Sequence, residues 1–265
     1  MSASDADPWA LVEAGEYFEA VPLLRRDAEG AARECGPHSV EAAEAYNRLG
    51  VACKFAGLFD DAEAAYALAL PVAEQIADED SELLAALLHN LGGLAHSRGL
   101  PNEAEPLARR GLAIRETSCP DPRGIAADEA ALAAILEALE RWDEAERSYR
   151  RALSIWSELG DDYEIAMTLN GLAATVRFGG RPEEAEPMFR EALAIIEADR
   201  GATHPDTATI RNNLAMLLNA TGRAVDALPL LEQAAADLEA LLGPDHPATV
   251  DIRGNRDRIA AQLQA

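Results

Sequence analysis

A pattern of small residues recurs along the chain about every 42 residues. Each copy has a glycine, an alanine five positions later, and another small residue seven positions after that. The leading positions are 15, 57, 99, 140, 180 and 222, with Glu140 replacing the glycine in one copy and Asp27 the last small residue in another. A leucine precedes the last five leading positions by eight residues: Leu49, Leu91, Leu132, Leu172 and Leu214. Six copies in one register predict a repeat architecture.

Each element of this pattern has a physical reason. Glycine adopts the positive φ that ends one helix and turns the chain into the next. Small residues seven apart share one face of a helix, where a neighbouring helix can approach closely. Apolar residues make up 49% of the chain and aromatic residues only 5%, so alanine and leucine dominate, and both favour helices over strands. We therefore expect an all-α fold of stacked, antiparallel helix pairs, an α-solenoid.

The pattern resembles the tetratricopeptide repeat. The residues that carry the resemblance are Asn213-Leu214-Ala215, followed by Gly222, Ala227 and Ala234. The usual period of that repeat is ~34 residues, so these units are about eight residues longer. They are most similar to the kinesin-light-chain subclass, through the segments GATHPD at 201–206 and GPDHP at 243–247. The resemblance implies a right-handed superhelix with first helices on its concave side and second helices on its convex side.

The register predicts one array over residues 1–265. It has a truncated unit (1–36), full units (37–78, 79–120, 121–160, 161–202 and 203–244) and a capping helix (245–265). Helices are expected at 7–14, 17–34, 39–56, 59–77, 81–98, 101–117, 123–139, 142–158, 162–179, 182–199, 205–221, 224–241 and 247–263. Prolines lie about one turn into four second helices, where proline normally breaks a helix. Similar prolines occur in the kinesin-light-chain subclass, so we expect slight bends at Pro22, Pro106, Pro187 and Pro229.

Candidate binding residues follow from the same register. Positions ten and three before each turn lie seven apart, hence on one face of the first helix. Asparagine can bond both groups of an extended peptide backbone, and a cation can clamp a carboxylate. The alternative is that the asparagines only link neighbouring helices of the array. The proposed partner-binding groove contains Asn47, Lys54, His89, His96, Asn170, Arg177, Asn212 and Asn219.

The third full unit departs from this pattern. It carries Ala130 and Glu137 at the groove positions and Glu140 at the turn. It also follows an irregular link over residues 118–122. The groove is therefore expected to be interrupted or recurved at this unit.

These features favour a non-catalytic adaptor that binds a protein or peptide, with acidic or C-terminal carboxylate groups as candidate ligands. A sensor of small molecules or signalling peptides is the alternative, and an enzyme on this scaffold is a third hypothesis. The chain has no phosphate-binding glycine loop, nucleophile elbow or HExxH helix. His89 and His96 would lie about 10 Å apart along one helix, too far for one metal ion. We expect no metal and no cofactor.

Charge and cysteine content narrow the setting. The net charge of −24 repels phosphate backbones and anionic lipids, so neither nucleic acid nor membrane is an expected partner. No apolar run approaches the ~18 residues of a membrane span, and no signal peptide is evident. The odd set Cys35, Cys53 and Cys119 indicates reduced thiols in the cytoplasm. An alanine-rich chain whose only lysine is Lys54 suggests a bacterial source.

The register makes a direct prediction about packing. Ala185 should lie in the seam between helices, so Ala185→Leu should overpack the seam and destabilise the fold by about 1–3 kcal/mol. Thermal melting measures this, and a melting curve identical to that of the unchanged chain would show that the register is wrong.

Overall fold

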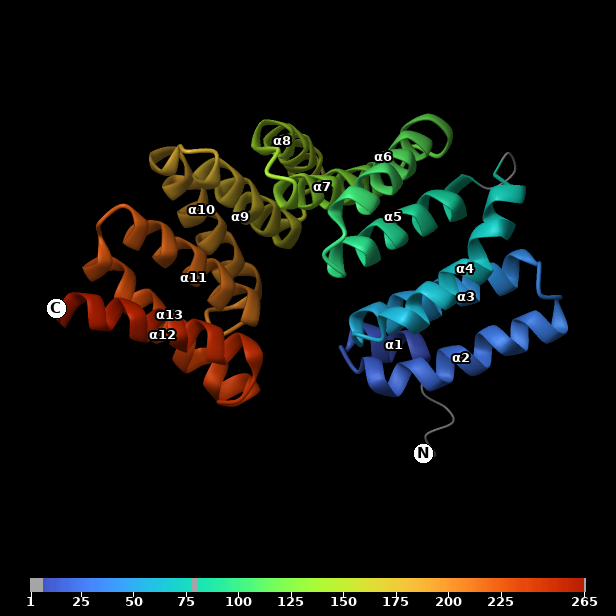
Figure 1. The fold of residues 1–265 in the computed structure, drawn as a ribbon, viewed down its shortest axis with the longest axis horizontal. Helices are drawn as coiled ribbons and strands as arrows, with labels where there is room; N and C mark the ends of the chain where they lie inside the picture. Colours follow the sequence, from blue (N-terminus) through green and yellow to red (C-terminus); the bar gives the residue numbers. More distant parts are fainter. Residues whose placement is uncertain (1–6, 78–80, 265) are drawn as a thin grey trace. The chain divides into compact units, whose positions relative to one another are not determined.

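The computed structural model describes residues 7–77 and 81–264, which form thirteen α-helices and no β-strand (Figure 1). The helices are α1 (Pro8–Glu13), α2 (Tyr17–Glu34), α3 (Val40–Phe55), α4 (Phe59–Gln75), α5 (Ser81–Ser97), α6 (Pro101–Ser118), α7 (Pro122–Ala138), α8 (Trp142–Leu159), α9 (Asp162–Phe178), α10 (Pro182–Arg200), α11 (Pro205–Ala220), α12 (Ala224–Leu242) and α13 (Pro247–Gln264). Every predicted helix is present, and no end differs from its prediction by more than two residues. We call the odd-numbered helices A helices and the even-numbered ones B helices.

The chain divides into two compact units. Unit 1 extends to Ile135 and contains α1 to α6 and most of α7. Unit 2 starts at Leu136 and contains the end of α7 and α8 to α13. Within each unit, A and B helices pack as antiparallel pairs and each pair stacks on the next. This arrangement confirms the predicted α-solenoid class.

Small residues line the seams between helices, as the register requires. The alanines five positions after the turns have no exposed surface: Ala20, Ala62, Ala104, Ala145, Ala185 and Ala227. The second small positions are equally closed at Ala69, Ala152, Ala192 and Ala234. At Gly111, an added Cβ would lie only 3.2 Å from the Cβ of Leu88 and 3.3 Å from the carbonyl oxygen of Ala85. The seam therefore excludes larger side chains by direct contact.

One hydrogen-bond pattern closes the turns between A and B helices. Gly57 donates its N–H to the carbonyl of Lys54 at 3.1 Å, and Leu58 donates to Cys53 at 2.8 Å. Such paired bonds satisfy the last carbonyls of a helix when the turn residue adopts a positive φ. The turn of the third full unit has the same bonds, although its turn residue is Glu140, with φ of 58°. Loss of the glycine has therefore left the turn geometry intact at the cost of local strain.

The prolines inside the B helices do not interrupt them. Pro22, Pro106, Pro187 and Pro229 are each the sixth residue of their helix, and α2, α6, α10 and α12 continue past them. At the sixth position, the missing N–H removes a single bond to the first turn. The expectation of unbroken helices is confirmed.

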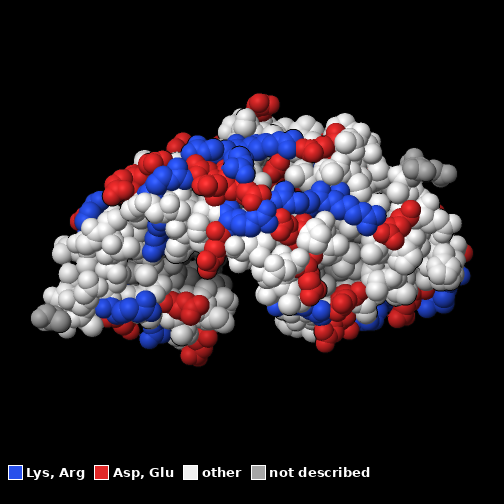
Figure 2. Space-filling model, turned by 45° about the horizontal axis from the view of Figure 1, so that its top comes forward, with Lys and Arg blue, Asp and Glu red and all other residues white. Residues whose placement is uncertain are grey.

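Ion pairs connect several successive repeats along the turn edge. Arg98, beside one turn, binds Glu63 and Asp60 of the preceding repeat at 2.6 Å each. Arg223 binds Glu186 at 2.9 Å in the same way. Arg181 pairs with Glu146, also in the same register. On the face drawn in Figure 2, basic and acidic side chains lie next to one another, so the acidic excess forms no field of a single sign there.

Within the two described stretches, none of the helices is long and apolar enough to cross a bilayer.

The strained turn gives a testable result. Glu140→Gly should stabilise unit 2 by about 1 kcal/mol, because glycine adopts the left-handed conformation without the Cβ penalty. The matched control Gly180→Glu, at a turn with φ of 87°, should destabilise by a similar amount. Chemical denaturation measures both; equal stability of Glu140→Gly and the unchanged chain would mean that the turn is unstrained.

Candidate functional site

The eight predicted groove residues all lie half-buried on A helices. Unit 1 carries Asn47 and Lys54 on α3, and His89 and His96 on α5. Unit 2 carries Asn170 and Arg177 on α9, and Asn212 and Asn219 on α11. Each unit therefore brings two predicted pairs onto neighbouring A helices.

The asparagines form a ladder between successive A helices. Asn90 donates its Nδ2 to the Oδ1 of Asn47 at 2.9 Å. Asn213 donates to Asn170 at 3.0 Å, and Asn255 to Asn212 at 2.9 Å. Each donor lies 43 residues after its acceptor. These bonds support the alternative reading that the asparagines link helices. They use only the amide oxygen, so the two donor hydrogens of each acceptor asparagine remain outside the ladder bond.

His89 is fixed by a buried acid. Its Nδ1 lies 2.7 Å from Oδ1 of Asp128, whose Oδ2 accepts from Nε of Arg115 at 2.8 Å. Arg115 and Asp128 are buried, and Gly124 leaves the space that the Arg115 side chain fills. A carboxylate at Nδ1 selects the tautomer that presents Nε2 as an acceptor. Sequence reasoning missed Arg115 and Asp128, because they lie outside the repeated register.

The two groove cations share one arrangement, once in each unit. Lys54 Nζ lies 4.8 Å from the ring centre of Phe55, and Arg177 Cζ lies 5.0 Å from that of Phe178. Phe55 stacks on Tyr17 at 5.3 Å, and Phe178 stacks on Trp142 at 5.7 Å. Burial lowers the pKa of both Lys54 and Arg177.

Neither cation forms an ion pair with another residue in the described part of the chain. Each is therefore a half-buried positive group in contact with an aromatic ring. In the sequence, Phe55 and Phe178 each lie two positions before a turn glycine, and the register alone did not indicate their contact with the cations.

His96 and Asn219 occupy the same register as these cations. Nδ1 of His96 and Oδ1 of Asn219 are buried and have no hydrogen-bond partner among residues 7–77 and 81–264. Burial also lowers the pKa of His96, which favours its neutral form. Buried polar atoms without a partner are uncommon in folded proteins.

Glu137 takes this register position in the third full unit. Its carboxyl accepts from Oγ1 of Thr175 at 2.7 Å and from the hydroxyl of Tyr149 at 3.1 Å. Burial raises the pKa of Glu137, and these two bonds only partly oppose it. Where two other repeats carry a cation, Glu137 therefore links the end of α7 to α8 and α9 within unit 2.

A cavity of about 350 Å³ lies between α3 and α5 in unit 1. It is lined by Glu44, Asn47, Arg48, Glu82, Leu83 and Ala86. The predicted Asn47 is thus at a hollow on the A-helix face. Arg48 and Glu44 were not predicted, although Arg48 directly follows Asn47 in the sequence.

The described residues contain no cluster of three or more His, Cys, Asp or Glu side chains that could hold a metal ion. Cys35, Cys53 and Cys119 are free thiols, and Cys53 is buried.

Comparison with known proteins addresses the fold and the family. A family model described as "Tetratricopeptide repeat" matches residues 10–75, 52–117, 126–198, 164–240 and 206–262. Protein KINESIN LIGHT CHAIN-RELATED 1 of Arabidopsis thaliana is 27% identical over 198 residues, 74% of this chain and 32% of that protein. The chain thus spans about a third of the length of that relative.

Two solved structures show the same fold. BtubC (BKLC) from P. vanneervenii has a TM-score of 0.70 and 24% identity, covering 86% of this chain and 92% of that chain. A STAND ATPase with a tetratricopeptide repeat sensor, from Pyrococcus horikoshii, has a TM-score of 0.71 and 15% identity, covering 97% of this chain and 42% of that chain. The similarity to a kinesin-light-chain-related protein thus appears in the sequence, and the solved structures share the fold.

The half-buried carboxyl of Glu137, whose pKa is raised, gives a testable pH effect. A carboxyl whose pKa is higher in the folded chain than in the unfolded chain is stabilising only below that range, so the fold loses stability as pH rises through it. Glu137→Gln should therefore be more stable than the unchanged chain at neutral pH, with the difference shrinking toward pH 4. Urea denaturation at several pH values tests this, with Glu191→Gln on the exposed side of α10 as control. A difference that is constant with pH would contradict it.

Proposed function

Because the chain belongs to the tetratricopeptide repeat family, we propose that it is a non-catalytic adaptor that binds a peptide or partner segment on the A-helix face. The observation that carries this proposal is the cavity between α3 and α5. It is lined by the predicted residue Asn47 together with Arg48 and Glu44. Scaffolds of this family are generally non-catalytic and bind protein or peptide partners.

The polar groups of this face suit an extended peptide. Ladder asparagines such as Asn47 and Asn170 retain N–H donors that a peptide carbonyl can accept. The tautomer of His89 set by Asp128 supplies an acceptor for a peptide N–H. These contacts bind the backbone of a ligand and do not select its side chains.

The cations supply the selective contact. Lys54 and Arg177 are half-buried and lack an ion-pair partner in the described chain, and attraction between charges is stronger where water is partly excluded. We assign to them an acidic side chain or a C-terminal carboxylate of the partner. Because the protein carries a net charge of −24, such a ligand needs these local cations to overcome general repulsion.

The setting proposed for this adaptor is the cytoplasm of a bacterium. The free state of Cys35, Cys53 and Cys119 supports a reducing compartment. The arginine-rich, alanine-rich composition supports the bacterial source.

A sensor of a small molecule or signalling peptide is the second candidate. Two buried polar atoms without partners among the described residues favour it: Nδ1 of His96 in unit 1 and Oδ1 of Asn219 in unit 2. A small polar ligand could satisfy either of them separately. Ligand-induced tightening of the fold, seen as amide-exchange protection over α5 and α11 with a metabolite extract freed of protein, would favour the sensor.

Capture of partners tests the adaptor. The full chain serves as bait in native cell extract, and the double variant Lys54→Gln/Arg177→Gln should retain about tenfold less partner, since a charged hydrogen bond contributes about 1.5–3 kcal/mol. The cations are cleaner probes than Asn170 and Asn212, whose oxygens also link neighbouring helices.

The matched control is Arg147→Gln/Arg258→Gln, which removes the same charge from exposed positions on α8 and α13. Thermal melting of both double variants confirms that they are folded. Equal capture by the two double variants would overturn the proposed role of the cations.

A further inference from the structure

A small apolar hollow lies in unit 1 between α4, α5 and α6. Its volume is about 110 Å³, and none of its lining residues belongs to the predicted groove. A closed apolar cavity of about 150 Å³ holds benzene, so this hollow has the size of one aliphatic side chain. Its apolar lining consists of Leu91, Leu94, Ala95, Leu100 and Leu107.

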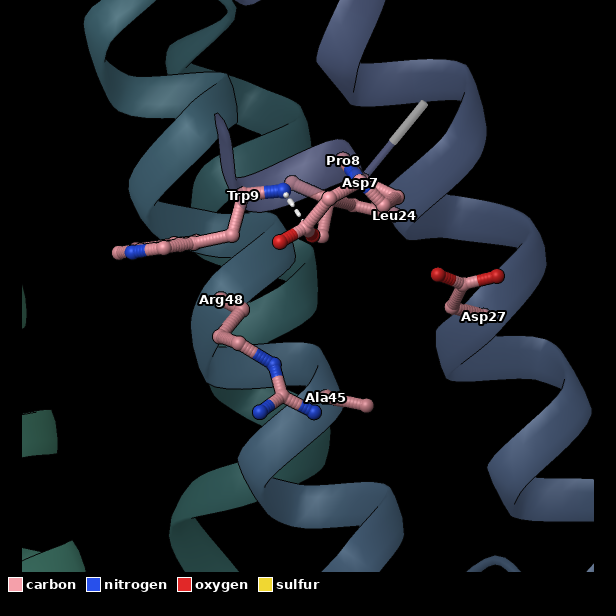
Figure 3. Close-up of a pocket in the computed structure, with 7 residues that line it drawn as sticks. All are labelled: Asp7, Pro8, Trp9, Leu24, Asp27, Ala45 and Arg48. Carbon is pink, nitrogen blue, oxygen red and sulfur yellow. Dashed lines mark hydrogen bonds between the residues drawn. The ribbon is translucent and has the colours of Figure 1, made fainter. Parts of the chain in front are cut away.

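Wider hollows of unit 1 are polar by comparison. The one between α1, α2 and α3 has a volume of about 450 Å³ (Figure 3). Asp27 of α2 and Arg48 of α3 line it from facing helices, and the indole of Trp9 points away from Asp27. Arg48 also lines the cavity at Asn47. Charged groups thus line both of these hollows, whereas apolar side chains form most of the lining at Leu91, where burial alone can favour association.

The apolar hollow exposes part of the core that other repeats close. Leu91 and Ala95, eight and four residues before the turn, are only half-buried. At the same positions of the other four full repeats, no residue is more than 3% exposed. These closed residues are Leu49, Cys53, Leu132, Leu136, Leu172, Val176, Leu214 and Leu218. Ala95 is also the smallest residue of its set, so space remains where the larger side chains fill it.

A leucine takes the position of an arginine at the edge of this hollow. Leu100 directly follows the turn and is 40% exposed. In two repeats of unit 2 this position is Arg181 or Arg223, which bind Glu146 and Glu186 of the preceding repeat. The methylene stem of an arginine can cover apolar surface beneath its charged group. Unit 1 therefore presents an apolar group where unit 2 presents a charged one, and exposed apolar patches mark interaction sites.

The charges at the rim favour a basic neighbour for that apolar group. Arg98 is the one cation among the lining residues, and Glu63 and Asp60 already bind it at 2.6 Å each. Glu103, on the first turn of α6, is exposed and forms no ion pair within residues 7–77 and 81–264. A basic group placed at Glu103 gains a favourable contact that salt weakens. The apolar hollow therefore supplies most of the binding, and the charges orient the segment.

We propose that the hollow bounded by Leu91, Ala95 and Leu100 is a docking surface for a protein segment, and that it takes one aliphatic side chain of that segment with a basic residue at Glu103. A segment suits the site better than a small apolar solute, because its backbone can cover the exposed Leu100 while its side chain fills the hollow. The lining residues are separate from those of the predicted groove. The chain thereby offers a second point of attachment, and the inference holds whether or not the groove binds an acidic group.

Capped tetrapeptides test this preference on the full chain. The probe is acetyl-Ala-Leu-Arg-Ala-amide, and the comparison peptides replace leucine by alanine, or arginine by citrulline, which has the same shape without the charge. The methyl resonances of Leu107, identified by their loss in Leu107→Ile, report binding in two-dimensional NMR titrations. The leucine peptide should shift them saturably and bind at least about tenfold more tightly than the alanine peptide. Citrulline should weaken binding about two- to fivefold at low salt and less at high salt.

Variants of the chain locate the effect. Leu100→Arg should weaken the leucine peptide at least about tenfold, because the stem of the arginine then covers the hollow. The backbone suits this change, since Leu100 has φ of −113° and ψ of 59° and Arg181 has φ of −122° and ψ of 60°. The matched Leu241→Arg, at an exposed leucine of α12, should leave the affinity unchanged. Thermal melting confirms that both variants are folded.

Three results would each overturn the proposal: equal binding of the alanine peptide, no saturable shift with the leucine peptide, or an affinity that Leu100→Arg leaves unchanged. Resonances of Leu107 that move with protein concentration in the unchanged chain, and not in Leu100→Arg, would assign the hollow to a second copy of the chain and overturn it as well. The peptide comparison uses the unchanged chain, so it decides the question even if Leu100→Arg does not fold.

Discussion

Close approach of helices at alanine and glycine positions is the constraint on which the rest of this structure depends. At Ala104 or Ala185 no side-chain surface remains exposed, and at Gly111 even a Cβ would crowd the facing helix. Helices packed this tightly leave little space inside the repeats for a ligand. Groups that bind a ligand must therefore lie on the free face of the A helices or in hollows at the surface.

Most of the fold could be predicted from the repeated register, because helix ends, turns and the seams between helices all depend on local sequence. It placed every helix correctly and placed Asn47, Lys54, His89 and His96 on the A helices of unit 1. The hydrogen-bond partners of these residues were harder to predict from the sequence. The bond from Asn90 to Asn47 follows from the register only once the stacking offset of successive helices is known.

Two other features were beyond a repeat-based prediction for a different reason. The buried pair of Arg115 and Asp128 that fixes His89 joins two successive repeats. The corresponding register positions of the other copies do not carry arginine and aspartate, so no repetition pointed to the pair. The hollow of unit 1 that Trp9 lines is formed by α1, α2 and α3 together, and a pattern read along one helix at a time does not reveal it. The turn at Glu140 is the opposite case. The residue departs from the glycine of the pattern, yet the backbone hydrogen bonds keep the turn in its usual conformation.

The asparagine ladder has a thermodynamic consequence. Each of its bonds joins one A helix to the next, so the same amides both hold adjacent repeats together and face a bound segment. Any ligand that draws an amide such as Asn170 out of the ladder exchanges a contact between repeats for a contact with itself. By linkage, occupancy of the face and the spacing of neighbouring repeats then become coupled variables. Mechanical tension that breaks the ladder bonds would then raise the affinity for such a ligand, and the bound ligand would lower the force needed to separate the repeats.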